Sequence, residues 1–397
     1  MNEQSIILIT KDALCKDYLP IYGNKYWKGQ TPNIDELASK GTIFNCHYTA
    51  APSTVMAFRS MMFGTFAHEQ PYADYIPMEV PQEDSYFFPY AKSLGFECHL
   101  LWDKIWVRMV LRYGNMFGPD VIIHNVDGIN QGVGPHTKAT NKPKRNDEIA
   151  RNSIQIIEDE VDKICKSEKK VFLWIHLPHV IRGRIGYGDD IDLFDDIIGM
   201  LRKYFQDDNI FISADHGNMD GYHNKYVYGF DVYTPAVEIP LITPKIDSLS
   251  EYNGLTSNVD IKALIFNRSI TQRDVVFSDC AYYAQPHRKL AIISNEFSYI
   301  FNKHKKREEL YDLRYDRYQR SNLISDHFFD TDRKLDTLTK DVYFSPRWEE
   351  AQDSRDYFRT IRDQVWKNPP WYIEIRGRLL AFAKMVFVKI RKLILGR

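Results

Sequence analysis

The stretch of sequence that decides the fold is TPNIDELASKGTIFNCHYTAAPSTVMAFRSMMFGT, residues 31–65. Its first part predicts a helix, because Thr31 stands at an N-cap position, Pro32 suits the first helical position and Gly41 is a stop signal. Its last part predicts a second helix over residues 55–63. Helices that alternate with short apolar runs are typical of an α/β protein.

Thr54 lies directly before the second predicted helix. A hydroxyl at a helix N-terminus faces N–H groups without helical acceptors and the positive end of the helix dipole, so a phosphate or sulfate is favoured beside it. The alternative is an ordinary N-cap, which is the common role of a threonine at this position.

Two carboxylates and an imidazole follow two further apolar runs. Residues 5–10 (SIILIT) and 209–213 (NIFIS) are predicted to be buried parallel strands. Asp12 lies past the end of the first strand, and Asp215 and His216 lie past the end of the second. Because ligands of open α/β sheets bind beyond the carboxyl ends of the strands, we expect these side chains at one site.

These residue types suit a metal-assisted attack on a phosphoryl or sulfuryl ester. A divalent cation neutralises the negative ester oxygens and lowers the pKa of a coordinated hydroxyl. Asp12, Asp215 and His216 are therefore predicted to bind the cation, with Thr54 as both ligand and nucleophile. The alternative for each aspartate is an ordinary turn residue after a strand.

Four segments in this order resemble the sulfatase and alkaline-phosphatase superfamily. The resemblance implies an alkaline-phosphatase-like α/β/α sandwich with a mostly parallel central sheet and a small C-terminal antiparallel subdomain. The similar segments are residues 31–65, HLPHVIRG (176–183), ISADHGNMDGYH (212–223) and EELYDLRYDRYQRSNLI (308–324).

Departures from the family pattern bear on the chemistry. Sulfatases carry a Cys or Ser that is converted to formylglycine, and Thr54 cannot be converted. It is similar instead to the nucleophile of phosphodiesterases and of phosphoglycerol or phosphoethanolamine transferases. Arg59 is one place off the Arg of the sulfatase motif, and Lys11 stands where many sulfatases have a second Asp. The Asp-x-x-x-His of two-zinc relatives is absent near residue 176, so we expect one ion, Mn²⁺, Mg²⁺, Ca²⁺ or Zn²⁺.

Further residues are assigned to the site by the resemblance and by position. His179 and His223 are predicted to assist the leaving group, and Lys225 and Lys104 are predicted to contact the substrate. His176 is interpreted as strand scaffolding. The alternatives are a structural histidine at a strand end for His179 and surface-loop positions for His223 and Lys225.

Composition fits a large α/β protein. The 397 residues include 52 basic and 53 acidic side chains, and this balance gives no signal for nucleic-acid binding. Five cysteines without a C-x-x-C motif suggest reduced thiols in a cytoplasmic protein. Neither a signal peptide nor an uncharged run long enough to span a bilayer is expected.

The predicted organisation has a catalytic α/β core over residues 1–270, a small subdomain over 271–325 and a charged extension over 326–397. Residues 376–397 contain seven Lys/Arg and no acid, with Leu379, Ala383, Val386, Ile390 and Leu393 on one helical face. A basic amphipathic helix is typical of attachment to an anionic membrane surface. The alternative is a terminal helix packed on its own domain.

The sequence thus favours a metal-dependent phosphotransferase or phosphodiesterase that forms a phospho-Thr54 intermediate. The substrate class would be a phosphorylated glycan, a lipid-linked glycan or a glycerol-phosphate compound. Alternatives are a catalytically inactive scaffold in a glycan-assembly complex and a sulfuric ester hydrolase.

Overall fold

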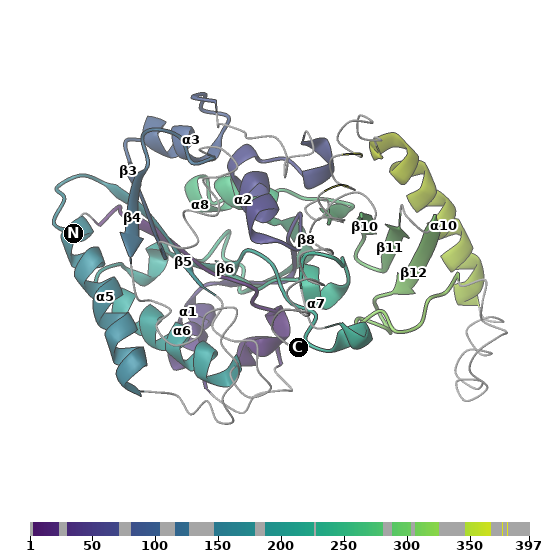
Figure 1. Cartoon of the computed structure of the whole chain (residues 1–397), viewed down its shortest axis with the longest axis horizontal. Coiled ribbons are helices and arrows are strands. Elements are labelled where there is room, and N and C mark those ends of the chain that lie inside the picture. Colours follow the sequence, from purple (N-terminus) through teal and green to yellow (C-terminus); the bar gives the residue numbers. More distant parts are fainter. Residues whose placement is uncertain are drawn as a thin grey trace.

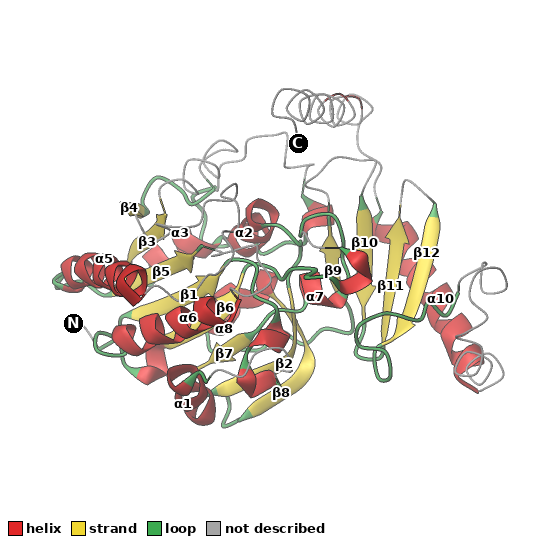
Figure 2. Cartoon of the chain, turned by 60° about the horizontal axis from the view of Figure 1, so that its bottom comes forward, coloured by secondary structure: helices red, strands yellow, loops and turns green. Residues whose placement is uncertain are grey.

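Two sheets organise the molecule (Figures 1 and 2). The computed structural model describes residues 3–23, 30–70, 81–103, 116–126, 147–178, 187–225, 228–280, 288–302, 306–324 and 346–366, together with Ile375 and Leu379. Within these residues, no helix combines the length and the apolar character that crossing a membrane requires.

The larger sheet has eight strands in the order β4-β3-β5-β1-β6-β7-β2-β8. Neighbouring strands pair in parallel except at β7, which is antiparallel to both β6 and β2. The mostly parallel central sheet is therefore confirmed. Its strands are β1 (Ile6–Lys11), β2 (Thr42–Tyr48), β3 (Glu97–Asp103), β4 (Ile122–Val126), β5 (Val171–Leu177), β6 (Ile210–Ala214), β7 (Leu241–Thr243) and β8 (Glu251–Ser257).

Helices cover both faces of this sheet (Figure 1). Successive side chains of a strand point to opposite faces, so Ile7 and Ile9 of β1 enter one core and Ile6 and Leu8 enter the other. The first core lies under α1 (Pro32–Lys40), α5 (Asp147–Cys165) and α6 (Tyr187–Leu201), and the second under α2 (Thr54–Phe63), α3 (Phe87–Ser93) and α8 (Ile261–Phe266). The predicted α/β/α sandwich is confirmed.

The first backbone N–H groups of α1 find other hydrogen-bond acceptors than the sequence predicted. The Thr31 side chain makes no capping hydrogen bond to the helix and donates instead to the Asp35 carboxylate at 3.0 Å. The backbone N–H groups of Asn33 and Ile34 donate to Asp195 of α6, at 3.3 and 2.8 Å. The Asp195 carboxylate, which comes from another helix, thus replaces a local side-chain cap.

Gly41 ends α1 for a steric reason. A Cβ atom at this position would lie 2.1 Å from the carbonyl oxygen of Thr243 in β7. The glycine therefore permits the close approach of the helix end to the sheet, which explains the stop signal in physical terms.

The smaller sheet is antiparallel, in the order β12-β11-β10-β9. Helix α10 (Pro346–Val365) lies against its outer face (Figure 2), where Leu290 and Ile292 pack with Phe358. The predicted C-terminal antiparallel sheet is present. Its strands are β9 (Val276–Asp279), β10 (Lys289–Ile293), β11 (Phe297–Asn302) and β12 (Arg307–Asp312).

The remaining described helical elements are short. They are α7 (Thr234–Val237) and single turns at Lys16–Tyr18, Pro20–Tyr22, Ala67–Glu69, Asp207–Asn209, Tyr222–Asn224 and Asn258–Asp260.

A buried carboxylate joins segments that are distant in sequence. Glu238, directly after α7, pairs with Lys16 at 2.5 Å and with Arg317 at 2.8 Å. Burial pushes the pKa of Glu238 up, but the two cations together hold it below its ordinary value. The N-terminal loop and the segment after β12 are thereby tied to the same point.

Replacing Glu238 with Gln should destabilise the protein strongly, by roughly 3–5 kcal/mol, because two cations would lose a buried counter-charge. Urea unfolding followed by circular dichroism measures this. Asp162→Asn is the control, since the Asp162–Lys166 pair lies on the surface and its loss should leave the unfolding midpoint almost unchanged. Equal effects of the two substitutions would contradict the structural role of Glu238.

Candidate active site

Two acidic side chains meet at the carboxyl end of the central sheet. Lys11 is the last residue of β1 and is in register with Ala214, the last residue of β6. Asp12 and Asp215 therefore leave adjacent parallel strands at the same level. With His216 they form a buried group whose potential ligand atoms all lie within 4.8 Å of one another. We call Asp12, Asp215 and His216 the ligand cluster.

Asp215 is oriented by the backbone. Its Oδ1 accepts hydrogen bonds from the N–H groups of Ala13 at 3.0 Å and His216 at 2.7 Å. Its Oδ2 is buried and accepts no hydrogen bond from any described residue. Burial raises the pKa of Asp215 to about 7, although the nearby Thr54 hydroxyl and the backbone N–H groups lower it. A buried carboxylate oxygen without a hydrogen-bond donor is a position that a cation would satisfy.

His216 presents one ring nitrogen to the cluster. Its Nδ1 lies 2.8 Å from the carbonyl oxygen of Gly217, so Nδ1 carries the proton and Nε2 keeps its lone pair. Nε2 lies 3.4 Å from Asp215 Oδ2 and 3.7 Å from Asp12 Oδ1. Burial lowers the pKa of His216, which favours the neutral ring that a metal requires.

Gly217 is required at its position by packing. A Cβ atom there would lie 2.0 Å from the carbonyl oxygen of Pro235. The Asp-His-Gly tripeptide is thus explained residue by residue: a carboxylate, an imidazole, and a glycine that lets the chain pass Pro235 while its carbonyl fixes the imidazole.

Thr54 completes the group. It is the first residue of α2 and is buried, and its Oγ1 lies 3.2 Å from His216 Nε2. The expectation placed it just before the helix, and the structure extends the helix by this one residue. The hydroxyl, the first-turn N–H groups and the ligand cluster therefore surround one position.

This donor set fits a divalent metal ion. It offers two carboxylates, one neutral imidazole nitrogen and one hydroxyl, which are oxygen and nitrogen ligands of the kind that Mn²⁺, Mg²⁺, Ca²⁺ and Zn²⁺ accept. The buried Oδ2 of Asp215 is the specific observation that supports the fit. Asp12, Asp215 and His216 would hold the ion, with Thr54 beside it.

Lys11 and Arg59, two of the departures from the family pattern, are both buried. The Lys11 ammonium pairs with Asp190 of α6 at 2.8 Å and donates to the carbonyl oxygen of Pro178 at 2.5 Å. Lys11 thus links the ends of β1 and β5 to α6. Its ammonium group is engaged by Asp190 and does not act as a metal ligand. Arg59 is fully enclosed within the packing of α2.

His223 and Lys225 contact a different set of groups from the ligand cluster. The His223 ring stacks on Tyr233 with a centroid distance of 3.9 Å, and its Nε2 lies 3.1 Å from the carbonyl oxygen of Tyr318. The Lys225 ammonium pairs with Asp231 at 2.5 Å. Their predicted roles in leaving-group assistance and substrate contact stay predictions. His179 and Lys104 lie outside the described residues.

Tyr228 was not identified from the sequence. Its ring lies over the ring of His216 with a centroid distance of 4.5 Å. A tyrosine in a loop carries no spacing or motif signal, so only the fold shows that it borders the ligand cluster.

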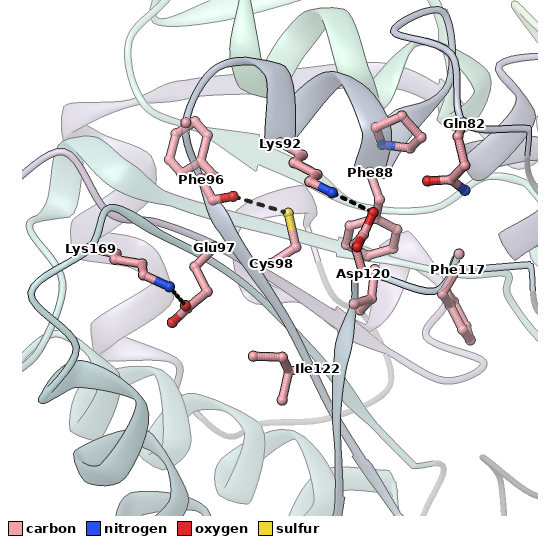
Figure 3. A pocket seen from close by; sticks show the side chains of 14 residues that line it. Gln82, Phe88, Lys92, Phe96, Glu97, Cys98, Phe117, Asp120, Ile122 and Lys169 are labelled. Carbon is pink, nitrogen blue, oxygen red and sulfur yellow. Dashed lines mark hydrogen bonds and ion pairs between the residues drawn. The ribbon is translucent and has the colours of Figure 1, made fainter.

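A cavity of about 330 Å³ lies elsewhere, between α3 and the first residues of β3 (Figure 3). Lys92 and Asp120 pair at its edge, and Cys98 lies in its wall. Cys98 is in register with Phe172, and Phe172 with Ile6, so the cavity lies at the amino end of the strands. That level is about 16 Å along the sheet from Lys11, at 3.3 Å per residue. The cavity is therefore separate from the ligand cluster.

Comparison with known proteins gives one family match and several similar folds. Residues 4–180 match the family model described as Sulfatase. This match covers less than half of the chain, and over that part it agrees with the resemblance to the sulfatase and alkaline-phosphatase superfamily. Two similar solved structures are a 2-O GAG sulfatase (14% identity, TM-score 0.61, covering 93% of this chain and 96% of the other) and the phosphonate monoester hydrolase of Agrobacterium radiobacter (13% identity, TM-score 0.60, covering 91% and 96%). At these identities the likeness concerns the fold.

A curated protein also matches part of the chain. It is a phosphopentomutase of Clostridium botulinum (strain Alaska E43 / Type E3), 28% identical over 141 residues. The match spans about a third of the length of each protein, 34% in both cases.

Proposed function

We propose that this protein is a metal-dependent phosphotransferase or phosphodiesterase that works through a phospho-Thr54 intermediate. The observation that carries the proposal is the position of Thr54 Oγ1, 3.2 Å from His216 Nε2 at the N-terminus of α2. A threonine hydroxyl can attack phosphorus, whereas it cannot become the formylglycine of a sulfatase. The proposed substrate class is a phosphorylated glycan, a lipid-linked glycan or a glycerol-phosphate compound.

The cation, when bound, would neutralise the ester oxygens and lower the pKa of the Thr54 hydroxyl. Thr54 Oγ1 forms a bond to phosphorus while the bond from phosphorus to the leaving oxygen breaks, and the hydroxyl proton of Thr54 ends, in net, on that leaving oxygen. Water or an acceptor hydroxyl then attacks the same phosphorus, and Thr54 recovers its proton as the Oγ1–P bond breaks. We propose that His179 or His223 assists the departure of the leaving group.

The compared proteins include enzymes named for phosphorus chemistry and enzymes named for sulfate chemistry. The names phosphopentomutase and phosphonate monoester hydrolase denote phosphorus chemistry, and the second protein has a fold similar to this chain. Sulfatases share the fold as well. The fold therefore does not distinguish the two classes, and the proposal rests on the Thr54 hydroxyl.

A comparison of model esters tests the choice. With Mn²⁺ present, we expect turnover of bis(p-nitrophenyl) phosphate to exceed that of p-nitrophenyl sulfate by about 10²-fold or more, because the sulfate route lacks its formylglycine. Release of nitrophenolate measures both rates. Faster turnover of the sulfate would favour a sulfuric ester hydrolase. If the protein turned over neither ester and also bound no metal, a scaffold would be favoured.

We also propose that residues 376–397 attach the protein to an anionic membrane surface, where a lipid-linked substrate would lie. The support is their seven cations and the absence of acids; nearly all of this segment lies outside the described residues, although Leu379 is 63% exposed. Attraction to anionic lipids contributes on the order of 1 kcal/mol per basic residue near the surface.

Co-sedimentation with phosphatidylserine vesicles should therefore remove the full chain from solution and leave a chain ending at Glu374 in the supernatant. The attachment should weaken as salt rises, because exposed charges are screened within about 8–10 Å. Equal, negligible sedimentation of both proteins would assign the segment to packing on its own domain.

A further inference from the structure

His176 lies directly behind the ligand cluster. It is the second-last residue of β5 and only 1% exposed, and its Nε2 lies 3.9 Å from Asp215 Oδ2. This distance is longer than a hydrogen bond, so the ring and the carboxylate interact electrostatically across the gap. The charge that Nε2 presents to the carboxylate therefore depends on which ring nitrogen carries the proton.

A short hydrogen-bond chain determines which ring nitrogen of His176 carries the proton. The indole Nε1 of Trp174 donates to Thr10 Oγ1 at 2.8 Å, and the same Oγ1 lies 2.8 Å from His176 Nδ1. Because indole is only a donor, it uses a lone pair of the hydroxyl and leaves the hydroxyl proton free to donate. The Nδ1 of His176 is a closer acceptor than the carbonyl oxygen of Ile175, which is 3.5 Å away. Nδ1 therefore accepts, and Nε2 carries the proton.

The opposite tautomer is disfavoured by its surroundings. It would place a second buried lone pair, in addition to that of His216 Nε2, against the carboxylate of Asp215. Burial, with the charge of Lys11 nearby, lowers the pKa of His176. The rings of Phe58 and Trp102 pack against it nearly at right angles with centroids 4.7 Å away and restrain its rotation.

We propose that His176 is a positioning residue, whose Nε2–H holds the Oδ2 atom of Asp215 in the direction that ligates the cation. Thr10 and Trp174 act one step further out by fixing the tautomer. Oδ1 of Asp215 is already held by the N–H groups of Ala13 and His216, so His176 controls the other oxygen. The inference rests on the proposed metal-dependent function. It replaces the interpretation of His176 as strand scaffolding alone.

Thr10→Val tests the proposal, because valine keeps the shape of threonine and removes the hydroxyl. Titration calorimetry with Mn²⁺ on the full chain, stripped beforehand with EDTA, measures affinity without relying on turnover. We expect affinity about 10-fold weaker or more in Thr10→Val, the size typical of changes in groups that orient metal ligands. Thr10→Ser, which keeps the hydroxyl, should restore affinity close to that of the unmodified protein.

The chain offers a matched control in β2 and β8. His47 Nδ1 lies 2.9 Å from Thr256 Oγ1, and both residues are buried, but neither belongs to the ligand cluster. Thr256→Val removes the same kind of hydrogen bond and should leave Mn²⁺ affinity unchanged. A loss equal to that of Thr10→Val would show a general effect of weakened packing and would overturn the proposal.

Melting in EDTA reports whether each variant folds. If Thr10→Val does not fold, His176→Leu serves as the second variant, since it removes Nε2–H and keeps an apolar side chain beside Phe58 and Trp102; it should show the same loss. Unchanged Mn²⁺ affinity in these variants would refute the positioning role and leave the proposed function intact. Failure of the unmodified protein to bind any of Mn²⁺, Mg²⁺, Ca²⁺ and Zn²⁺ would instead refute the metal-dependent function.

Discussion

Thr54→Ala should lower the turnover of a phosphodiester by roughly 10³-fold or more, because removing the attacking atom closes the covalent route. The side chain is buried at the start of α2 and its Oγ1 faces His216. Alanine is well accepted in a helix, so the fold should persist. The rate of nitrophenolate release from bis(p-nitrophenyl) phosphate measures the effect.

Thr54→Ser is the control for this prediction. Serine keeps a hydroxyl at the same position and should retain a substantial part of the rate. If the alanine variant turned over the phosphodiester at the unmodified rate, Thr54 would not be the nucleophile.

Asp215→Asn should reduce bound divalent metal to a small fraction and lower turnover in parallel. Asn keeps an oxygen that can accept the hydrogen bonds from Ala13 and His216, but it removes the negative charge from the buried group. Elemental analysis of the purified proteins measures occupancy. Binding of Mn²⁺ to the unmodified protein should also raise its melting temperature, because a ligand that binds only the folded state stabilises it.

Asp195→Asn provides a comparison for the metal prediction. Asp195 of α6 is also a buried aspartate, and it accepts backbone hydrogen bonds from the first turn of α1. Its substitution should leave metal content unchanged even if it lowers stability. Unaltered metal content in Asp215→Asn would remove this residue from the site.

The sequence predicted the ligand cluster because its members obey strong local rules. Residues 5–10 and 209–213 are short apolar runs, and Asp12 and Asp215 each lie two residues past the end of a run. Once both runs are parallel neighbours, Asp12 and Asp215 must leave the sheet at the same edge. Little tertiary information is needed to bring these residues together.

The parts that the sequence did not predict depend on tertiary contacts. The cap of α1 comes from Asp195, which is more than 160 residues away. The hydrogen bonds that fix His176 require β1 and β5 to be in register. Tyr228 reaches His216 from a loop whose path no periodicity predicts. Local patterns cannot encode such contacts, since each depends on the course of another segment.

Quenched-flow mass spectrometry of the peptide that contains Thr54 tests the central claim most directly. The full chain, loaded with Mn²⁺, is mixed with bis(p-nitrophenyl) phosphate, stopped in acid during turnover and digested. A phospho-Thr54 route predicts a phosphoryl ester on Thr54 that disappears as substrate is exhausted. A phosphoryl ester on another residue, or turnover throughout which Thr54 stays unmodified, would contradict it.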